Sequence, residues 1–303
     1  MKKNTSIAVL TYPIKHRKTF DVLSLLKTNG YDNVMVCATP FHYTKKKYPI
    51  YQHRPEMNYD IPDLSDMCSN LGFDFKMGSI ESFEIEEDRI VLIGGAGILE
   101  ESFIKDHKVI NSHPGYIPEV RGLDSLKWAI VENKPIGVTT HLIGDYVDAG
   151  LVIERRVIDV YLTDTFHALA QRVYENEVSM LVEAIEKIGK TEPEMIKPAD
   201  SELHKRMPKE IEQGLLDAFE IYKKKHAIIM EERRQWIMTV MFLHTARPGL
   251  DYIIGYRISG NLCNNIFWNE KHFRENAMIN PEDIKLRVID DFTGHKIGVK
   301  FDN

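Results

Sequence analysis

The feature that most constrains this chain is the alternation of short β-rich runs with helical patterns over about its first 190 residues. The apolar run at residues 6–10 is followed by a helical pattern at residues 20–26 that Gly30 ends, and then by a second apolar run at residues 33–38. This order is typical of the βαβ unit, because two parallel strands need a crossover connection between them. The sequence therefore predicts an α/β fold.

The same alternation continues to the end of this region. Its later elements are a helix near 63–71, a strand at 89–93, a brief helix after Glu100, a strand at 108–111, a helix near 123–131, strands at 137–143 and 151–157, and a long helix that opens at Thr163–Asp164 and ends near Gly189. We therefore predict a Rossmann-like, mostly parallel sheet covered by helices.

A polar, proline-bearing stretch at residues 190–200 is the predicted linker,. It divides the chain into a catalytic domain at 1–190 and a C-terminal region at 201–303. That region begins with a helical pattern over 208–244, and beyond Gly249 short β-like runs predict a small β-rich appendage. An apolar stripe on the helical part is expected to pack in the core or in a dimer interface, and it consists of Ile211, Leu215, Phe219 and Tyr222,.

Composition excludes several classes of partner. The formal net charge of −6 and the pI near 6.1 give no general attraction to nucleic acid or to an anionic membrane,. The three cysteines form no CxxC pair and the histidines lack metal-ligand spacing, so no disulfide framework, no metal site and a cytoplasmic location are expected,. The apolar run that precedes Tyr12 is too short for a signal-peptide core or a membrane span,.

The residues that carry chemistry lie between 109 and 122, in the segment VINSHPGYIPEVRG. Asn111 and His113 are two apart on a predicted strand, so their side chains face the same way at its carboxyl end, where open α/β sheets bind their ligands. An amide and an imidazole directed at one atom suit a carbonyl that becomes a tetrahedral oxyanion. Asp148, in the loop GDYVDAG, is the candidate carboxylate partner of His113,.

These two segments resemble the NxHPSxLPxxRG and DxGxxI signatures of the 10-formyltetrahydrofolate-dependent formyltransferases, and the resemblance extends from about Ser6 to Leu181. It implies the formyltransferase fold, N10-formyltetrahydrofolate as co-substrate, and Asn111, His113 and Asp148 as the catalytic residues. It also implies a folate pocket whose lining consists of Gly97, Ile98, Leu99 and Asp145.

Two cationic stretches, at residues 15–18 and 43–55, could hold an anion such as a nucleotide diphosphate, although such stretches are more often solvated,. The candidate substrate-binding residues are Lys15, Arg17, Lys46, His53, Arg54 and Arg121. The segments HRPEM, at 53–57, and RMPKEIEQGLLDAFEIYKKK, at 206–225, resemble the sugar N-formyltransferase branch of the family. That resemblance implies a nucleotide-linked amino sugar as partner, most simply dTDP-4-amino-4,6-dideoxyglucose for surface-glycan (O-antigen) synthesis, and a homodimer.

Other members of the family remain alternatives. A methionyl-tRNA formyltransferase needs a basic tail, whereas residues 200–303 hold 16 Lys and Arg against 16 Asp and Glu. Glycinamide ribonucleotide formyltransferases have a Gly-Ser-Asn loop where this chain has Tyr12–Lys18, and formyltetrahydrofolate deformylases usually carry an extra domain ahead of the core. A non-catalytic folate-binding or nucleotide-sugar-binding module is the alternative of a different class.

Overall fold

The computed structural model describes residues 3–40, 49–57, 60–97, 99–144, 150–190, 194–196, 202–228, 237–247, 250–259, 287–291 and 296–300. The chain divides into two compact units. The first comprises residues 1–160 and 164–226, and the second comprises residues 161–163 and 227–303.

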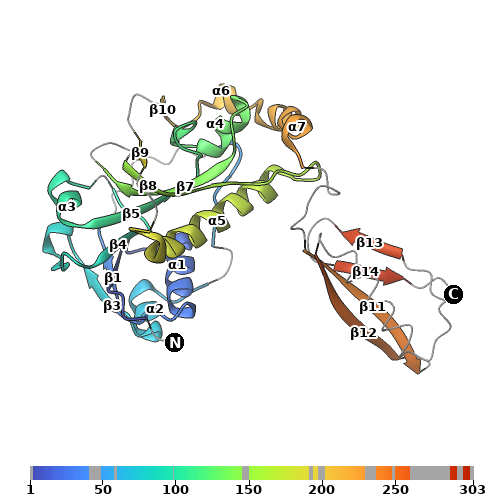
Figure 1. Ribbon diagram of the computed structural model, residues 1–303, viewed down its shortest axis with the longest axis horizontal. Coiled ribbons are helices and arrows are strands. Elements are labelled where there is room, and N and C mark those ends of the chain that lie inside the picture. Colours follow the sequence, from blue (N-terminus) through green and yellow to red (C-terminus); the bar gives the residue numbers. More distant parts are fainter. Residues whose placement is uncertain are drawn as a thin grey trace. The chain divides into compact units, whose positions relative to one another are not determined.

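The described part of the first unit is built on an eight-stranded sheet with the order β3-β2-β1-β4-β5-β7-β8-β9 (Figure 1). Its strands are β1 (Ile7–Thr11), β2 (Val34–Ala38), β3 (Asp74–Met77), β4 (Ile90–Ile93), β5 (Lys108–His113), β7 (Gly137–Ile143), β8 (Gly150–Val157) and β9 (Glu194–Ile196).

The sheet is parallel from β3 to β5 and antiparallel from β5 to β9. This confirms the predicted mostly parallel sheet. In the antiparallel part, Asn111 of β5 lies opposite His141 of β7, and His113 lies opposite Thr139. Two strands of this eight-stranded sheet were not predicted from the sequence. The edge strand β3 has a largely exposed, charged sequence, and β9 lies within the segment predicted as a linker.

Helices surround this sheet, and a further short pairing joins β6 (Arg121–Gly122) to β10 (Leu203–His204). The helices are α1 (Arg17–Thr28), α2 (Leu64–Leu71), the 3-10 turn η1 (Ile80–Ser82), α3 (Glu101–Asp106), α4 (Ser125–Val131), α5 (Phe166–Lys187), α6 (Lys209–Glu212) and α7 (Leu215–His226). The predicted long helix is therefore present as α5, and the hydroxyl of Thr165 caps it by accepting a hydrogen bond from the Ala168 amide,.

The central strands bury both faces, which explains their continuous apolar sequences. Ile7 and Val9 of β1 pack toward α1 and α5, which contact each other, whereas Ala8 and Leu10 join the cluster that includes residues of α3. This alternation follows from the two-residue period of a strand. Figure 1 shows α5 lying along the sheet.

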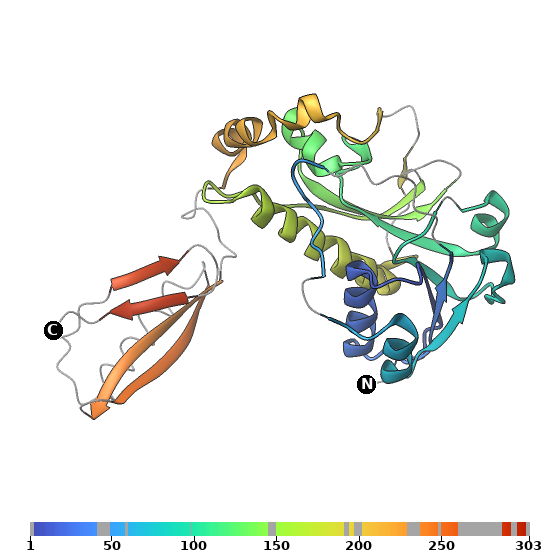
Figure 2. The ribbon, with the colours of Figure 1, turned by 180° about the vertical axis from the view of Figure 1, so that it is seen from behind.

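The C-terminal helices of the first unit complete a second core beside α4. Leu215, Phe219 and Tyr222 of α7 are buried against α4 and α5, while Ile211 is 39% exposed. Figure 2 shows α7, in orange, beside α4, in green. Three of the four residues of the predicted apolar stripe therefore pack in a core. Because of this packing, the two units divide after His226, later in the chain than the predicted boundary at 190–201.

A buried ion pair fastens these helices to the rest of the unit. The Lys127 side chain on α4 is 0% exposed and the Glu212 side chain on α6 is 2% exposed, and the two form a salt bridge. The Glu212 carboxylate also accepts hydrogen bonds from the backbone amides of Ile50 and Tyr51. One carboxylate therefore fixes the segment 49–57 against α4 and α6.

The described residues of the second unit form two antiparallel hairpins, in keeping with the predicted β-rich appendage. They pair β11 (Ile237–Arg247) with β12 (Leu250–Ser259), and β13 (Arg287–Asp291) with β14 (Lys296–Lys300). The prediction of a helical pattern over 208–244 is wrong for residues 237–244, because they pair with a neighbouring strand and form part of a hairpin. Residues 229–236 of that prediction lie outside the described ranges. Among the helices that the structure describes, none has both the length and the apolar character to cross a membrane.

Truncating Glu212 tests the buried pair. Glu212→Ala would leave the Lys127 ammonium buried without its counter-charge, so we expect the free energy of unfolding to fall by about 3–5 kcal/mol. Urea denaturation of the full chain measures this loss, and Glu210→Ala, which removes an exposed carboxylate from the same helix, is the matched control. A loss below about 1 kcal/mol, the range of a surface ion pair, would contradict the assigned role.

Candidate active site

The end of β5 presents the predicted pair of polar side chains. Asn111 is half-buried and His113 is 6% exposed, and both belong to the same face of the strand,. The chain then turns at Pro114 and Gly115. A side chain at position 115 would lie 2.7 Å from both His113 Nε2 and the Val120 carbonyl oxygen, so only glycine fits beside the imidazole.

A serine on α4 contacts the imidazole. Ser125 Oγ lies 3.0 Å from His113 Nε2 and donates a hydrogen bond of 2.7 Å to the Gly122 carbonyl oxygen. Ser125 is 2% exposed. The ring of His113 is therefore held from α4 as well as from its own strand.

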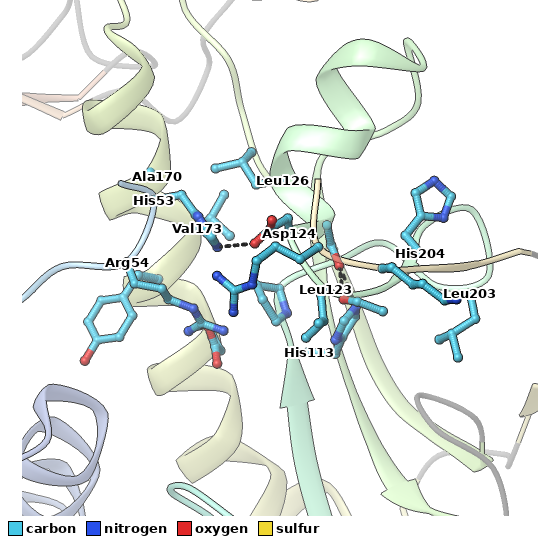
Figure 3. Close-up of a pocket in the computed structure, with 17 residues that line it drawn as sticks. His53, Arg54, His113, Leu123, Asp124, Leu126, Ala170, Val173, Leu203 and His204 are labelled. Carbon is cyan, nitrogen blue, oxygen red and sulfur yellow. Dashed lines mark hydrogen bonds and ion pairs between the residues drawn. The ribbon is translucent and has the colours of Figure 1, made fainter. Parts of the chain in front are cut away.

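His113 opens into a cavity of about 560 Å³ (Figure 3), a volume typical of small-molecule sites,. Elements that are distant in the sequence form its walls: the segment 53–54, the end of β5, the start of α4, the middle of α5 and the segment 203–206. Two predicted substrate-binding residues, His53 and Arg54, line this cavity together with His113.

His53 is an uncharged polar group in the cavity wall. Its Nε2 lies 3.7 Å from an Asp124 carboxylate oxygen, toward which it points in Figure 3, and its buried Nδ1 has no hydrogen-bond partner among the described residues. Burial, assisted by the positive charges of Arg54 and Lys127, lowers the pKa of His53 to about 4 against the opposing effect of Asp124,.

A second cavity, of about 1160 Å³, lies at the carboxyl ends of β1 and β4. It adjoins the first, because four residues line both: Arg54, Tyr174, Glu177 and Arg206. Its walls include the glycine-rich segment 94–96 and a concentration of cations. Those cations are Lys15, Arg17, Lys18, Arg54 and Arg206.

Glu177 of α5 stands between the two cavities and organises part of this charge. Its carboxylate is 1% exposed and forms salt bridges with Lys18, at 2.8 Å, and with Arg54. Burial by itself would raise the pKa of the Glu177 carboxyl, but Arg54 and Lys18 together hold it below its ordinary value,. An ionised carboxylate between two cations leaves a net positive charge at this boundary.

The other predicted site residues are distributed as follows. Lys15 and Arg17 line the second cavity, where Lys15 pairs with Asp60 at 2.6 Å and Arg17 with Asp21 at 2.7 Å. Of the predicted folate residues, Gly97 is exposed and Leu99 packs in the core on the α3 side of the sheet. Four predicted residues lie outside the described ranges: Lys46, Ile98, Asp145 and Asp148.

Arg121 is 4% exposed, and its Nε and Nη1 have no hydrogen-bond partner within the described ranges. It precedes Gly122, which lines the His113 cavity, but Arg121 itself is not among the residues that line the two cavities. Buried guanidinium N–H groups are costly to leave unsatisfied, so these two nitrogens are suited to donate to an anionic or carbonyl group.

Sequence reasoning missed Ser125, Glu177 and Arg206. Glu177 gave a usable signal, because it occupies a core position of an amphipathic helix, between buried residues such as Tyr174 and Leu181,. A charged residue at such a position requires a buried partner. Ser125 and Arg206 gave no local signal, since their positions at the site depend on how α4 and β10 pack.

Comparison with known proteins identifies the domain. A sequence profile described as formyl transferase matches residues 79–185, which include β5, α4 and most of α5. Residues 79–185 therefore match the formyl transferase family model, and the resemblance inferred from the motifs is confirmed.

The sequence is also similar to individual proteins. The phosphoribosylglycinamide formyltransferase of Bacillus subtilis strain 168 is 25% identical over 163 residues, which are 52% of this chain and 80% of that protein. The trifunctional purine biosynthetic protein adenosine-3 of Gallus gallus is 33% identical over 101 residues, which are 32% of this chain but only 10% of that protein.

A solved structure shares the fold over a longer stretch. The crystal structure of WlaRD, a sugar 3N-formyl transferase studied in the presence of dTDP and 5-N-formyl-THF, matches with a TM-score of 0.51 and 15% identity, over 84% of this chain and 98% of that one. At this level of identity the match shows a common fold.

The neutral state of His53 makes stability depend on pH. The pKa of His53 is about 4 in the folded chain and about 6.5 for an unperturbed histidine,. The unfolded chain therefore binds more protons in this window, and the free energy of unfolding falls as pH drops from about 6.5 to about 4.

We expect His53→Gln to make this fall shallower, as measured by urea denaturation at a series of pH values. His167→Gln, which alters an exposed histidine, is the control and should leave the slope unchanged. An equally steep fall in both variants would show that His53 is not neutral in the folded chain.

Proposed function

We propose that this chain transfers the formyl group of N10-formyltetrahydrofolate to the amine of a nucleotide-linked amino sugar. The observation that carries this proposal is the adjacency of the two cavities. One holds His113, and the other concentrates cations where a diphosphate could bind. A substrate that is anionic at one end and carries its reacting amine at the other would fit such a pair.

The residues of the chain would position the two substrates and stabilise the charge that develops during formyl transfer. Asn111 would donate a hydrogen bond to the oxyanion that forms when the amine attacks the formyl carbon, and His113 would stabilise the same charge. Asp148 would orient His113 and help to remove the proton of the attacking amine. Holding amine and formyl group together lowers the entropic part of the barrier, so no covalent intermediate is required.

The diphosphate would bind the cations of the second cavity. Arg206 is the most available of them, because it forms no ion pair with any described residue, whereas Lys15, Arg17, Lys18 and Arg54 each have a carboxylate partner. His53 would contact the sugar from the wall of the His113 cavity. Lys46 and Arg121 are the remaining proposed substrate contacts. Gly97, Ile98, Leu99 and Asp145 are proposed for the folate.

Within this proposal the acceptor is dTDP-4-amino-4,6-dideoxyglucose, used for surface-glycan (O-antigen) synthesis, and the enzyme works as a cytoplasmic homodimer. The common fold with WlaRD, over 84% of this chain, supports the sugar branch.

The second candidate is glycinamide ribonucleotide formyl transfer. The identity to the Bacillus subtilis relative over 80% of that protein favours it. The segment after β1 disfavours it, because Tyr12, Pro13 and Ile14 stand where that enzyme class has a Gly-Ser-Asn phosphate loop. The ring of Tyr12 also fills the space next to Gly95, which a side chain at position 95 would meet at 2.9 Å.

One assay separates these functions. Formyl transfer from N10-formyltetrahydrofolate would be measured with TDP-linked and GDP-linked 4-amino-4,6-dideoxy sugars, glycinamide ribonucleotide, methionyl-tRNA and water. Transfer to a sugar nucleotide is the expected result. Transfer to glycinamide ribonucleotide or methionyl-tRNA, release of free formate alone, or no turnover would each overturn the proposal and select one of the alternatives, the last being a binding module.

Removing a catalytic group should reduce turnover strongly. We expect Asn111→Ala, and separately Asp148→Ala, to lower kcat at least about a hundredfold, which is the usual effect of losing one oxyanion donor or its support. Thermal unfolding should be close to that of the unaltered chain. Near-normal turnover in a folded variant would refute the assigned role.

Removing Arg206 tests the diphosphate site. Because a hydrogen bond to a charged group contributes about 1.5–3 kcal/mol, Arg206→Met should weaken binding of TDP by at least about tenfold, as measured by calorimetry. Lys224→Met removes the same charge from an exposed position on α7 and should leave the affinity unchanged. Equal affinities in the two variants would place the diphosphate elsewhere.

A further inference from the structure

The hydroxyl of Ser125 has one proton and two polar neighbours. It lies 2.7 Å from the Gly122 carbonyl oxygen and 3.0 Å from His113 Nε2. A carbonyl oxygen can only accept a hydrogen bond, whereas an imidazole nitrogen can donate or accept according to its tautomer. The serine proton must therefore be directed at Gly122, and the serine oxygen faces His113 with a lone pair.

This arrangement determines the state of the imidazole. If Nε2 lacked a proton, two lone pairs would face each other at hydrogen-bond distance inside the protein, where an unsatisfied contact is expensive. We propose that Ser125 is a positioning residue that keeps neutral His113 in the tautomer protonated at Nε2. It follows that Nδ1 carries no proton in the neutral ring.

The surroundings of Ser125 restrict its hydroxyl proton to this direction. Ser125 is 2% exposed and His113 is 6% exposed, so both groups are largely shielded from bulk water. The carbonyl is fixed as well. Gly122 has a φ of +90° and pairs with β10 so closely that a side chain there would lie 2.2 Å from the His204 carbonyl oxygen,.

The fixed tautomer also bears on the proposed catalytic aspartate, and this step rests on the proposed function. With Nε2 committed to Ser125, any hydrogen bond from His113 to the Asp148 carboxylate must come from Nδ1. Both ring nitrogens then carry protons, so His113 pairs with Asp148 only as the imidazolium. A cationic His113 stabilises an oxyanion better than a neutral ring does.

The tautomer can be observed directly by NMR. The full chain would be labelled with 15N at histidine, and two-bond proton–nitrogen correlations would be recorded at a pH where the ring is neutral. His113→Asn identifies the signals. We expect a protonated, pyrrole-type Nε2 and a pyridine-type Nδ1, and the opposite pattern would overturn the inference.

Substitution of the serine supplies a second test. Ser125→Ala should give a mixture of tautomers and lower kcat about tenfold, with KM changed less than about twofold, because one hydrogen bond to the ring is lost. Ser125→Thr keeps a hydroxyl and should preserve the Nε2-protonated form. An unchanged tautomer in Ser125→Ala would show that Ser125 does not set it.

Ser112→Ala is the matched control. Ser112 is also buried and precedes His113 on β5, but its hydroxyl bonds to Thr140 Oγ1 at 3.2 Å. This variant should leave the tautomer unchanged, and a change equal to that of Ser125→Ala would overturn the inference. The NMR result is independent of turnover. An Nε2-protonated ring in a chain without formyl transfer would refute only the proposed function, whereas an Nδ1-protonated ring in an active enzyme would refute only this inference.

Discussion

The ion pair between Lys127 and Glu212 holds together three segments that are far apart in the sequence. Lys127 belongs to α4, Glu212 belongs to α6, and the Glu212 carboxylate also accepts hydrogen bonds from the backbone amides of residues 50 and 51. A buried charge is tolerated only when it is paired and hydrogen-bonded, so the three segments can occupy only a narrow set of relative positions. The walls of the His113 cavity depend on this constraint, since residues 53 and 54 follow the bonded amides and Ser125 starts α4.

A second buried carboxylate has a comparable role at the boundary of the two cavities. Glu177 reaches from α5 to Lys18 at the start of α1 and to Arg54 in the segment 49–57. Two cations are thus kept close together by one anion, and the excess charge remains positive. Such a concentration of positive charge is suited to an anion, as the proposed function requires. The Lys127–Glu212 pair therefore fixes the walls of the His113 cavity, and Glu177 keeps two cations together at the boundary of the two cavities.

The imidazole of His113 is held in place independently of the ion pairs of Glu212 and Glu177. His113 is placed by the strand register of β5 against β7, by the turn at Gly115, and by the hydroxyl of Ser125. Each of these supports is short-range and directional, as is required when a ring must hold one orientation and one tautomer. In the proposed function, the ion pairs would determine where the substrate can lie, and the hydrogen bonds at His113 would determine how the imidazole contacts it.

The sequence by itself determined the features that depend on local periodicity and on a contiguous motif. The alternation of apolar runs predicted the α/β sheet, and residues 111 and 113, two apart on one strand, predicted a shared face at its carboxyl end. Only the tertiary structure decided that Ser125 bonds to His113, that Glu177 joins Lys18 to Arg54, that α7 belongs to the first unit, and that residues 237–244 form a strand. These contacts join residues that are far apart in the sequence, so the pattern of any one segment does not reveal them. They arise from the order of the strands and from the packing of helices against them, which no single segment of the sequence specifies.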